Sequence, residues 1–309
     1  MADAKIWRSL LFVPANNWKM MNKATTEQED AVIIDLEDAC PPADKETGRI
    51  FARDIIPLFK SHGIDTLVRV NSLKAMGLTA QDIEIIVREE LDGIILPKSE
   101  SKQNIETVAR LLAKAEKQKK LEKEIFIVPL LESPKGILNA EEVATASPRV
   151  VGLSFGAADY MREIGTGFAL TKMTPDEYAL LLMYPRSVIS VTAAAMGILA
   201  IDTPFFGLLT DLIGVRSEAN RARLMGFKGK MATHPRHIEI LNEVFAPSDE
   251  DVALSRRVIS AYEKAEAEGN GAVTLDGKMI DVAMYKMGLE TVRKAEGIEQ
   301  RKNSVKAKS

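Results

Sequence analysis

Two acidic residues, Glu132 and Asp159, stand out because each follows a short apolar segment, and the two segments are one strand-plus-helix unit apart. Carboxylate oxygens are the ligands that Mg²⁺ prefers, and a magnesium site commonly uses one or two of them and leaves its other positions to water and substrate. Either acid alone could equally form a salt bridge or cap a helix. Together, at this spacing, they predict a Mg²⁺ site, with Mn²⁺ as the alternative ion.

Basic and acidic side chains follow the neighbouring apolar segments. Arg69 can offer a fixed cationic fork to a carboxylate or a developing oxyanion, although it could instead pair structurally with Glu37 or Asp38. Those two acids are too many to bind one cation directly, so we expect them to act beside the metal, through water or by orienting Lys98. His234 could be a catalytic base, but because a proline-started segment follows it, we favour a hydrogen-bonded histidine that fixes that loop.

The elements that would position these residues follow a regular pattern. Short segments rich in Val, Ile and Leu alternate with longer segments of helical periodicity, which is typical of βα units around a parallel sheet. Eight such strands close a TIM (β/α)8 barrel, whose chemistry lies at the carboxyl ends of its strands. The predicted strands are Ser9–Val13, Ala31–Leu36, Thr66–Val70, Gly93–Leu96, Ile125–Leu130, Val150–Phe155, Ile198–Ile201 and Gly229–Ala232.

A second, smaller part of the chain follows the predicted barrel. We assign residues 1–240 to a catalytic barrel domain and residues 241–309 to a C-terminal helical extension with a polar tail. The extension contains a predicted helix at Glu250–Glu268 and an amphipathic helix at about Asp281–Lys294. Appended elements of this kind commonly lie across an active-site mouth or against a neighbouring subunit, although they can also merely complete the domain; we predict a lid.

Composition excludes several classes of partner. Lys and Arg total 41 against 44 Asp and Glu, a formal net charge of -3, which gives no electrostatic footprint for nucleic acid or an anionic membrane. Cys40 is the only cysteine, so an intrachain disulfide is excluded and a reducing compartment is favoured. The longest apolar region falls short of the ~20 residues that span a bilayer. We expect a cytoplasmic protein with neither nucleic-acid nor membrane partners.

Several ordered motifs resemble those of a known family, the HpcH/HpaI aldolases, in the citrate lyase β-subunit-like branch that includes malyl-CoA and citramalyl-CoA lyases. The resemblance covers nearly the whole chain. The motifs are RSLLFVPANN at Arg8–Asn17, IDLEDA at Ile34–Ala39, RVN at Arg69–Asn71, LPK at Leu96–Lys98, ESPKG at Glu132–Gly136, LSFGAADY at Leu153–Tyr160 and GFKGKMATHPRHI at Gly226–Ile238.

The resemblance implies roles for particular residues. Glu132 and Asp159 match the acids that bind Mg²⁺ in the family, and Arg69 matches the arginine that stabilises the enolate of the acyl thioester. Asp281, in Met279-Ile280-Asp281, corresponds to the family's proton-transfer residue, which reaches the site from a lid often donated by a neighbouring subunit. On sequence alone Asp281 would be an ordinary helix N-cap. Four residues are candidates for contacts to coenzyme A: Phe12, Pro14, Lys19 and Pro204.

The resemblance also implies an activity. We expect a Mg²⁺-dependent carbon–carbon lyase that reversibly cleaves malyl-CoA, citramalyl-CoA or citryl-CoA to acetyl-CoA or propionyl-CoA and a 2-oxo acid. Three alternatives stay open: a malate-synthase-like condensation followed by thioester hydrolysis, a citrate lyase β subunit that acts on an acyl-carrier-protein thioester, and a non-catalytic subunit that binds coenzyme A. The proposed lid favours a homotrimer or homohexamer.

Overall fold

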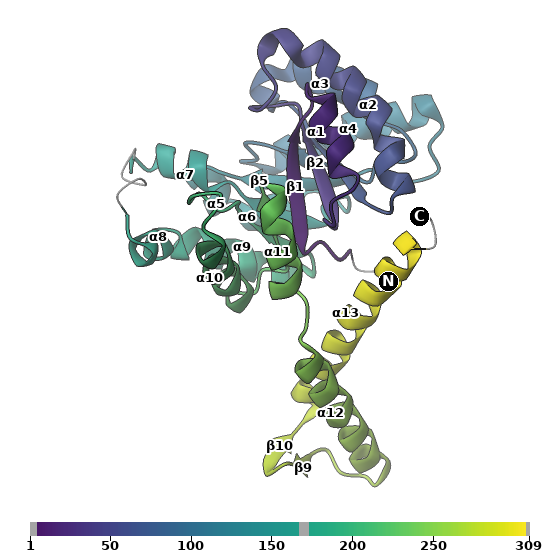
Figure 1. Cartoon of the computed structure of the whole chain (residues 1–309), viewed down its shortest axis with the longest axis vertical. Helices are drawn as coiled ribbons and strands as arrows, with labels where there is room; N and C mark the ends of the chain where they lie inside the picture. The colour runs from purple at the N-terminus through teal and green to yellow at the C-terminus, as the bar shows by residue number, and fades with distance from the viewer. Residues whose placement is uncertain (1–4, 167–172, 307–309) are drawn as a thin grey trace. The chain divides into compact units, whose positions relative to one another are not determined.

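The computed structural model describes residues 5–166 and 173–306, the last three of these by their backbone alone. It divides the chain into two compact units (Figure 1). One unit runs from Trp7 to Asn242, and the other joins the residues from Glu243 onward to those before Trp7. Each unit has its own buried apolar cluster.

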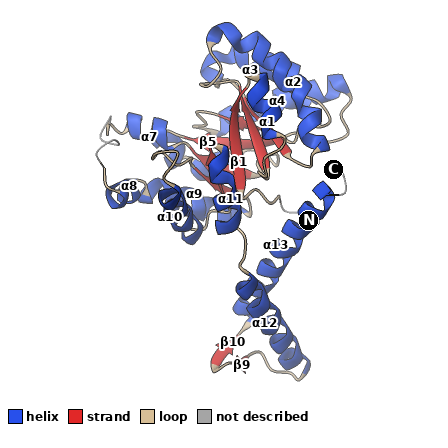
Figure 2. Ribbon diagram, viewed as in Figure 1, coloured by secondary structure: helices blue, strands red, loops and turns tan. Residues whose placement is uncertain are grey.

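The larger unit is a closed parallel barrel. Its eight strands are hydrogen-bonded in sequence order, and the last pairs with the first. Figure 2 shows these strands in red with helices around them. The predicted TIM barrel is therefore confirmed. The strands are β1 (Ser9–Pro14), β2 (Ala31–Asp35), β3 (Asp65–Arg69), β4 (Gly93–Leu96), β5 (Phe126–Leu131), β6 (Gly152–Phe155), β7 (Leu199–Asp202) and β8 (Gly229–Ala232).

The strand predictions were accurate in the middle of each strand and less so at the ends. Those for β4 and β8 are confirmed to the residue, whereas most others shift by one residue at one or both ends. The sixth strand begins at Gly152, so the predicted start at Val150 was wrong. Val150 makes only an isolated bridge to Ile127, which is outside the continuous ladder. Strand ends depend on which residues of the neighbouring strand are available for pairing, and the sequence does not show this.

Apolar side chains fill the interior of the barrel, so it is a packed core and not a channel. Residues from alternate positions of the strands form one buried cluster. Its members are Trp7, Leu10, Ala31, Ile33, Leu67, Ile95, Val128, Leu130, Ile201 and Met231. Because apolar side chains occupy the interior, the polar residues that follow the strands lie at the mouth of the barrel.

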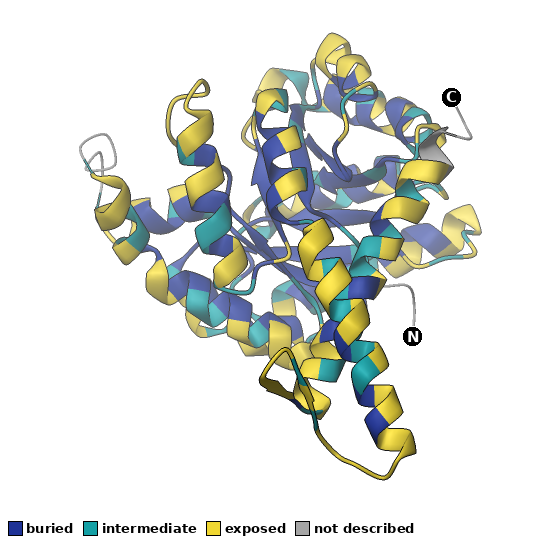
Figure 3. Ribbon diagram, turned by 60° about the horizontal axis from the view of Figure 1, so that its bottom comes forward, coloured by how far each residue is buried: buried dark blue, intermediate teal, exposed yellow. Residues whose placement is uncertain are grey.

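Amphipathic helices cover the outside of the barrel, and Figure 3 shows many of them divided into a buried and an exposed side. In α4 (Lys102–Lys119), Ile105, Val108 and Leu112 are buried, and the helix ends at Lys120 in the left-handed conformation. Among the described residues, no single helix is long and apolar enough to cross a membrane, and only one bent pair, α8 (Pro175–Leu181) with α9 (Met183–Met196), meets those two criteria together. The other helices of the unit are α1 (Trp18–Ala24), α2 (Lys45–Ser61), α3 (Met76–Ile86), α5 (Pro134–Leu138), α6 (Ala140–Ala144), α7 (Ala157–Glu163), α8 (Pro175–Leu181), α9 (Met183–Met196), α10 (Leu212–Leu224) and α11 (Ile238–Val244).

The smaller unit contains two long helices and a hairpin. These are α12 (Asp249–Ala267), β9 (Val273–Leu275), β10 (Lys278–Ile280) and α13 (Val282–Lys306). Val258, Tyr262 and Ile280 form a small buried cluster that holds the hairpin to α12. The last helix continues to Lys306, so its predicted end at about Lys294 was wrong. Strong helix formers continue past that point, and the buried Ile298 gives them an anchor. That this extension acts as a lid stays a prediction.

Candidate active site

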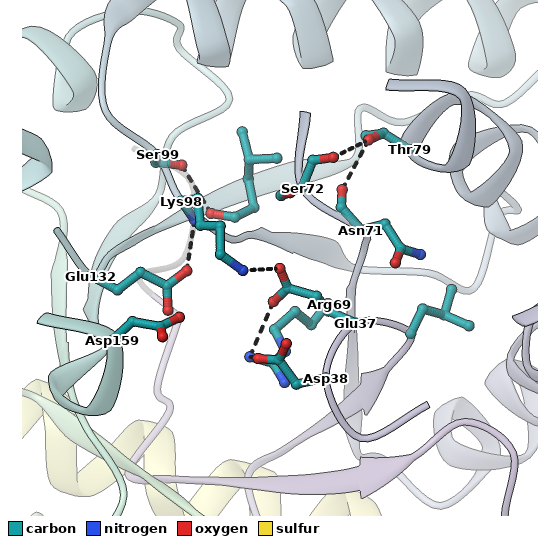
Figure 4. A network of polar contacts seen from close by, with 12 residues as sticks. Glu37, Asp38, Arg69, Asn71, Ser72, Thr79, Lys98, Ser99, Glu132 and Asp159 are labelled. Carbon is teal, nitrogen blue, oxygen red and sulfur yellow. Dashed lines mark hydrogen bonds and ion pairs between the residues drawn. The ribbon is translucent and has the colours of Figure 1, made fainter. Parts of the chain in front are cut away.

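The two predicted metal ligands follow neighbouring strands of the barrel, Glu132 after β5 and Asp159 after β6. Glu132 directly follows β5 and is buried, and its Oε1 accepts a hydrogen bond from the Lys98 backbone N–H at 2.7 Å. Asp159 lies in the first turn of α7, with Oδ1 2.9 Å from Arg162 Nη1. Figure 4 shows the two carboxylates at neighbouring positions. The structure therefore brings this pair together at the carboxyl ends of its strands.

The electrostatics around Glu132 favour a bound cation. Burial and the charge of Glu37 raise the pKa of Glu132 to about 8, an effect that the Lys98 backbone N–H opposes and Asp159 reinforces. A divalent ion would relieve the repulsion among these acids. No cluster of three or more His, Cys, Asp or Glu residues suited to a metal occurs within the described part of the chain. The Glu132 and Asp159 carboxylates nevertheless fit Mg²⁺, because this ion needs only one or two carboxylates from the protein and their mutual repulsion favours a cation between them.

Gly156, which follows β6, makes room for the Glu132 side chain. A Cβ atom at this position would lie 2.5 Å from Glu132 Cβ and 2.7 Å from its Oε2. Any residue with a side chain would therefore push the carboxylate from its place. We did not single out Gly156 from the sequence, because a close approach between neighbouring strands leaves no pattern in a single chain.

Arg69 is the last residue of β3, and its main partner is Asp35. The guanidinium donates from Nε to Asp35 Oδ1 at 2.7 Å and from Nη2 to Asp35 Oδ2 at 2.5 Å. Its Nη1 is 3.3 Å from both Glu37 Oε2 and Asp38 Oδ2. We did not identify Asp35 from the sequence. Cross-strand register was the signal that could have found it, because Asp35 is the direct partner of Arg69 in the β2–β3 ladder.

Lys98 connects the predicted metal ligand Glu132 to the acids that follow β2 (Figure 4). Its backbone is in the left-handed region at φ 52°, which is uncommon for a residue other than glycine. In this conformation its N–H points to Glu132, while its Nζ donates to Glu37 Oε1 at 2.6 Å. Glu37 in turn faces Arg69, so a continuous chain of polar contacts joins Glu132 to Arg69. Strain of this kind is concentrated at functional sites.

The four candidates for coenzyme A contacts occupy different environments. Phe12 packs its ring 5.1 Å from the Arg69 guanidinium carbon, so it belongs to the same site. Pro14 ends β1, Lys19 is exposed in α1, and Pro204 is buried two residues after β7. For all four, a contact with coenzyme A stays a prediction.

Asp281 and His234 both cap helices. Asp281 follows β10, and its Oδ1 accepts from the N–H groups of Ala283 and Met284 at 3.0 Å each. This is the N-cap role that sequence alone assigned to it. It lies in the smaller unit, so its proton-transfer role stays a prediction. His234 Nδ1 accepts from the Arg236 N–H at 3.1 Å, which fixes the start of a short 3-10 turn.

The raised pKa of Glu132 leads to a prediction about the metal-free protein. An acid whose pKa is about 8 when folded and near 4.5 when unfolded costs stability as the pH rises between these values. In EDTA, Glu132→Gln should therefore be more stable than the wild type at pH 9, by on the order of 1–3 kcal/mol, with the gain shrinking toward pH 5. Thermal unfolding from pH 5 to 9 measures this.

Two comparisons make that measurement decisive. Glu163→Gln removes an exposed acid near Asp159 and should show no such pH-dependent gain. Adding Mg²⁺ should stabilise the wild type more than Glu132→Gln, because a ligand stabilises the state that binds it. A Glu132→Gln protein that is less stable than the wild type in EDTA at pH 9 would contradict our account of the buried charge.

The chain is similar to several known proteins over most of its length. Residues 8–235 match the family model described as HpcH/HpaI aldolase/citrate lyase. The chain is 36% identical over 281 residues to citrate lyase subunit beta of Haemophilus influenzae, covering 90% of this chain and 92% of the relative. It is 33% identical over 312 residues to L-malyl-CoA/beta-methylmalyl-CoA lyase of Rhodobacter capsulatus, covering 96% of each.

A solved structure extends these similarities to the fold. Protein CitE from Mycobacterium tuberculosis, in complex with magnesium, acetoacetate and coenzyme A, matches with a TM-score of 0.74 and 28% identity. The match covers 93% of this chain and 97% of that one. The resemblance that we inferred from the ordered motifs is thereby confirmed.

Proposed function

Because this chain belongs to the HpcH/HpaI aldolase/citrate lyase family and is a lyase that acts on a coenzyme A ester, we propose that it cleaves a β-hydroxyacyl-CoA with the help of Mg²⁺. The products would be acetyl-CoA or propionyl-CoA and a 2-oxo acid. The observation that carries this proposal is the grouping of Glu132, Asp159 and Arg69 at the ends of barrel strands. Malyl-CoA, citramalyl-CoA and citryl-CoA are the substrates to test.

Each residue of the site has a separate task in this proposal. Glu132 and Asp159 would hold Mg²⁺, which when bound polarises the oxo acid's carbonyl and neutralises its carboxylate. Arg69 stabilises the negative oxygen that develops on the thioester, where fixed positive charge has its largest effect. Phe12 covers the guanidinium of Arg69 and limits its contact with water. Manganese stays a prediction from the sequence.

Proton movement completes the reaction. During cleavage, the bond between the thioester α-carbon and the hydroxyl-bearing carbon breaks, and that hydroxyl becomes the carbonyl of the oxo acid as it loses its proton. The α-carbon gains a proton, and we assign this transfer to Asp281. A homotrimer or homohexamer in which one chain supplies Asp281 to another stays part of the proposal, as does a cytoplasmic location.

The similarity to a citrate lyase subunit makes a carrier-protein thioester the second candidate substrate. Hydrolysis of the thioester after condensation is a further variant of the reaction. A protein that binds coenzyme A without turnover is the least favoured alternative, because Glu132, Asp159 and Arg69 are all present together.

One assay separates these candidates. Purified protein with Mg²⁺ should condense acetyl-CoA or propionyl-CoA with glyoxylate, pyruvate or oxaloacetate, and mass spectrometry should find an intact β-hydroxyacyl-CoA. Free coenzyme A with the hydroxy acid would indicate hydrolysis instead. Turnover only with an acyl-carrier-protein thioester would support the second candidate. Thermal stabilisation by acetyl-CoA without turnover of any of these compounds would contradict a catalytic role.

A further inference from the structure

Asp35 occupies an unusual position for an acid, because it is the last residue of β2 and almost fully buried, with 1% of its surface exposed. Its two oxygens accept four hydrogen bonds. Oδ1 accepts from Arg69 Nε at 2.7 Å and from the Glu37 N–H at 2.8 Å. Oδ2 accepts from Arg69 Nη2 at 2.5 Å and from the Ala39 N–H at 3.0 Å. A carboxylate held in this way cannot turn.

These contacts divide the guanidinium of Arg69 into two edges. The edge formed by Nε and Nη2 is occupied by Asp35 in a bidentate pair, which is the strongest arrangement for these groups. The third nitrogen, Nη1, has only longer contacts of 3.3 Å, to Glu37 and Asp38. The Asp38 side chain is 64% exposed, so solvent screening weakens its pairing with Arg69. Nη1 is therefore the nitrogen of Arg69 that the protein holds least tightly.

We propose that Asp35 is the positioning residue for Arg69: it fixes the Nε–Nη2 edge and thereby presents Nη1 to the reacting oxygen. This inference rests on the proposed function, in which Arg69 stabilises negative charge on the thioester. Asp35 does not touch the substrate and acts only through Arg69. A misplacement of a charged group by about 1 Å can cost on the order of 10²-fold in rate, so a fixed orientation is worth a dedicated buried acid.

The loop after β2 provides a matched control. Asp35 also holds this loop through its bonds to the backbone of Glu37 and Ala39. Lys45 also holds this loop, because its Nζ donates to the Leu36 carbonyl at 2.5 Å and to the Glu37 carbonyl at 2.6 Å. None of these Lys45 contacts involves Arg69. Lys45→Met therefore disturbs the loop while leaving the Asp35–Arg69 pair intact.

Steady-state kinetics test the positioning role. Asp35→Asn should lower kcat about 10–100-fold with little change in KM for the acyl-CoA, because Arg69 acts in the transition state. In an Arg69→Ala background, Asp35→Asn should cause no further loss, since the two residues act as one unit. Lys45→Met should keep kcat within a few-fold of the wild type. Additive losses in the double variant, or an equal loss in Lys45→Met, would overturn the proposal.

A second measurement does not depend on catalysis. The Nε–H group of Arg69, assigned in a ¹⁵N spectrum by its disappearance in Arg69→Lys, should exchange slowly with solvent in the wild type because Asp35 holds it. The Nε–H of the exposed Arg110 is the fast-exchanging comparison. Fast exchange at Arg69 would refute the fixed orientation. If the wild type cleaves no coenzyme A ester but Arg69 Nε–H is protected, the proposed function fails while the Asp35–Arg69 pairing stands.

Discussion

Glu132→Gln should lower kcat/KM for carbon–carbon cleavage by about 10³-fold or more, and Asp159→Asn should have the same effect. Each variant keeps the size of the side chain but removes one of the charges that would hold Mg²⁺. Loss of a metal's charge stabilisation in the transition state is worth several kcal/mol, which corresponds to this factor. Assays at saturating Mg²⁺ with a substrate identified by the condensation assay measure the effect.

The control for these variants lies on the same helix as Asp159. Glu163 also pairs with Arg162, at 3.8 Å compared with 2.9 Å for Asp159, and it is exposed. Glu163→Gln should keep full activity, because an exposed ion pair contributes little and no predicted ligand is lost. The expected loss is about 10³-fold, so a Glu132→Gln protein that keeps more than about a tenth of wild-type activity would contradict the ligand assignment.

Arg69→Lys should lower kcat by roughly 10²- to 10³-fold while changing KM for the acyl-CoA much less, since one electrostatic donor to the transition state is worth about that much. Lysine keeps the charge but has no planar fork, so it cannot bind Asp35 through two nitrogens and also present a third. Steady-state kinetics that determine kcat and KM separately measure this effect.

An arginine outside the site supplies the comparison. Arg53 lies in α2 with its side chain 46% exposed and pairs with Asp54. Arg53→Lys should leave both kinetic constants unchanged, since surface substitutions away from such sites have small effects. If Arg69→Lys were as active as Arg53→Lys, positive charge alone would be sufficient and the fixed fork would have no role.

The sequence predicted the barrel well because its physical cause is local and repeated. Each strand is a short run of β-branched and leucine residues, and each following helix shows a regular apolar face, so alternation alone indicates the fold. The same logic placed Glu132, Asp159 and Arg69 together, because the carboxyl ends of parallel strands share one rim. The exact strand ends were harder, as Val150 shows, because they depend on the pairing partner.

The parts of the site that escaped prediction depend on contacts between strands. Asp35 looks like one more acid of a cluster, and only its position opposite Arg69 shows that it is a buried partner. Gly156 matters because of the space that Glu132 occupies on the neighbouring strand. Lys98 has an unusual backbone conformation that its residue type does not suggest. Asp281 was singled out by the family resemblance alone, since its local contacts are those of an N-cap.

The metal dependence of the cleavage reaction tests the central claim most directly. Protein stripped of metal with EDTA and assayed with a β-hydroxyacyl-CoA should be inactive, and added Mg²⁺ should restore the rate in a saturable manner. The same titration should restore little or no activity to Glu132→Gln or Asp159→Asn. Full activity of the wild type in EDTA, or an unchanged Mg²⁺ response in either variant, would contradict the claim that these two carboxylates hold the catalytic ion.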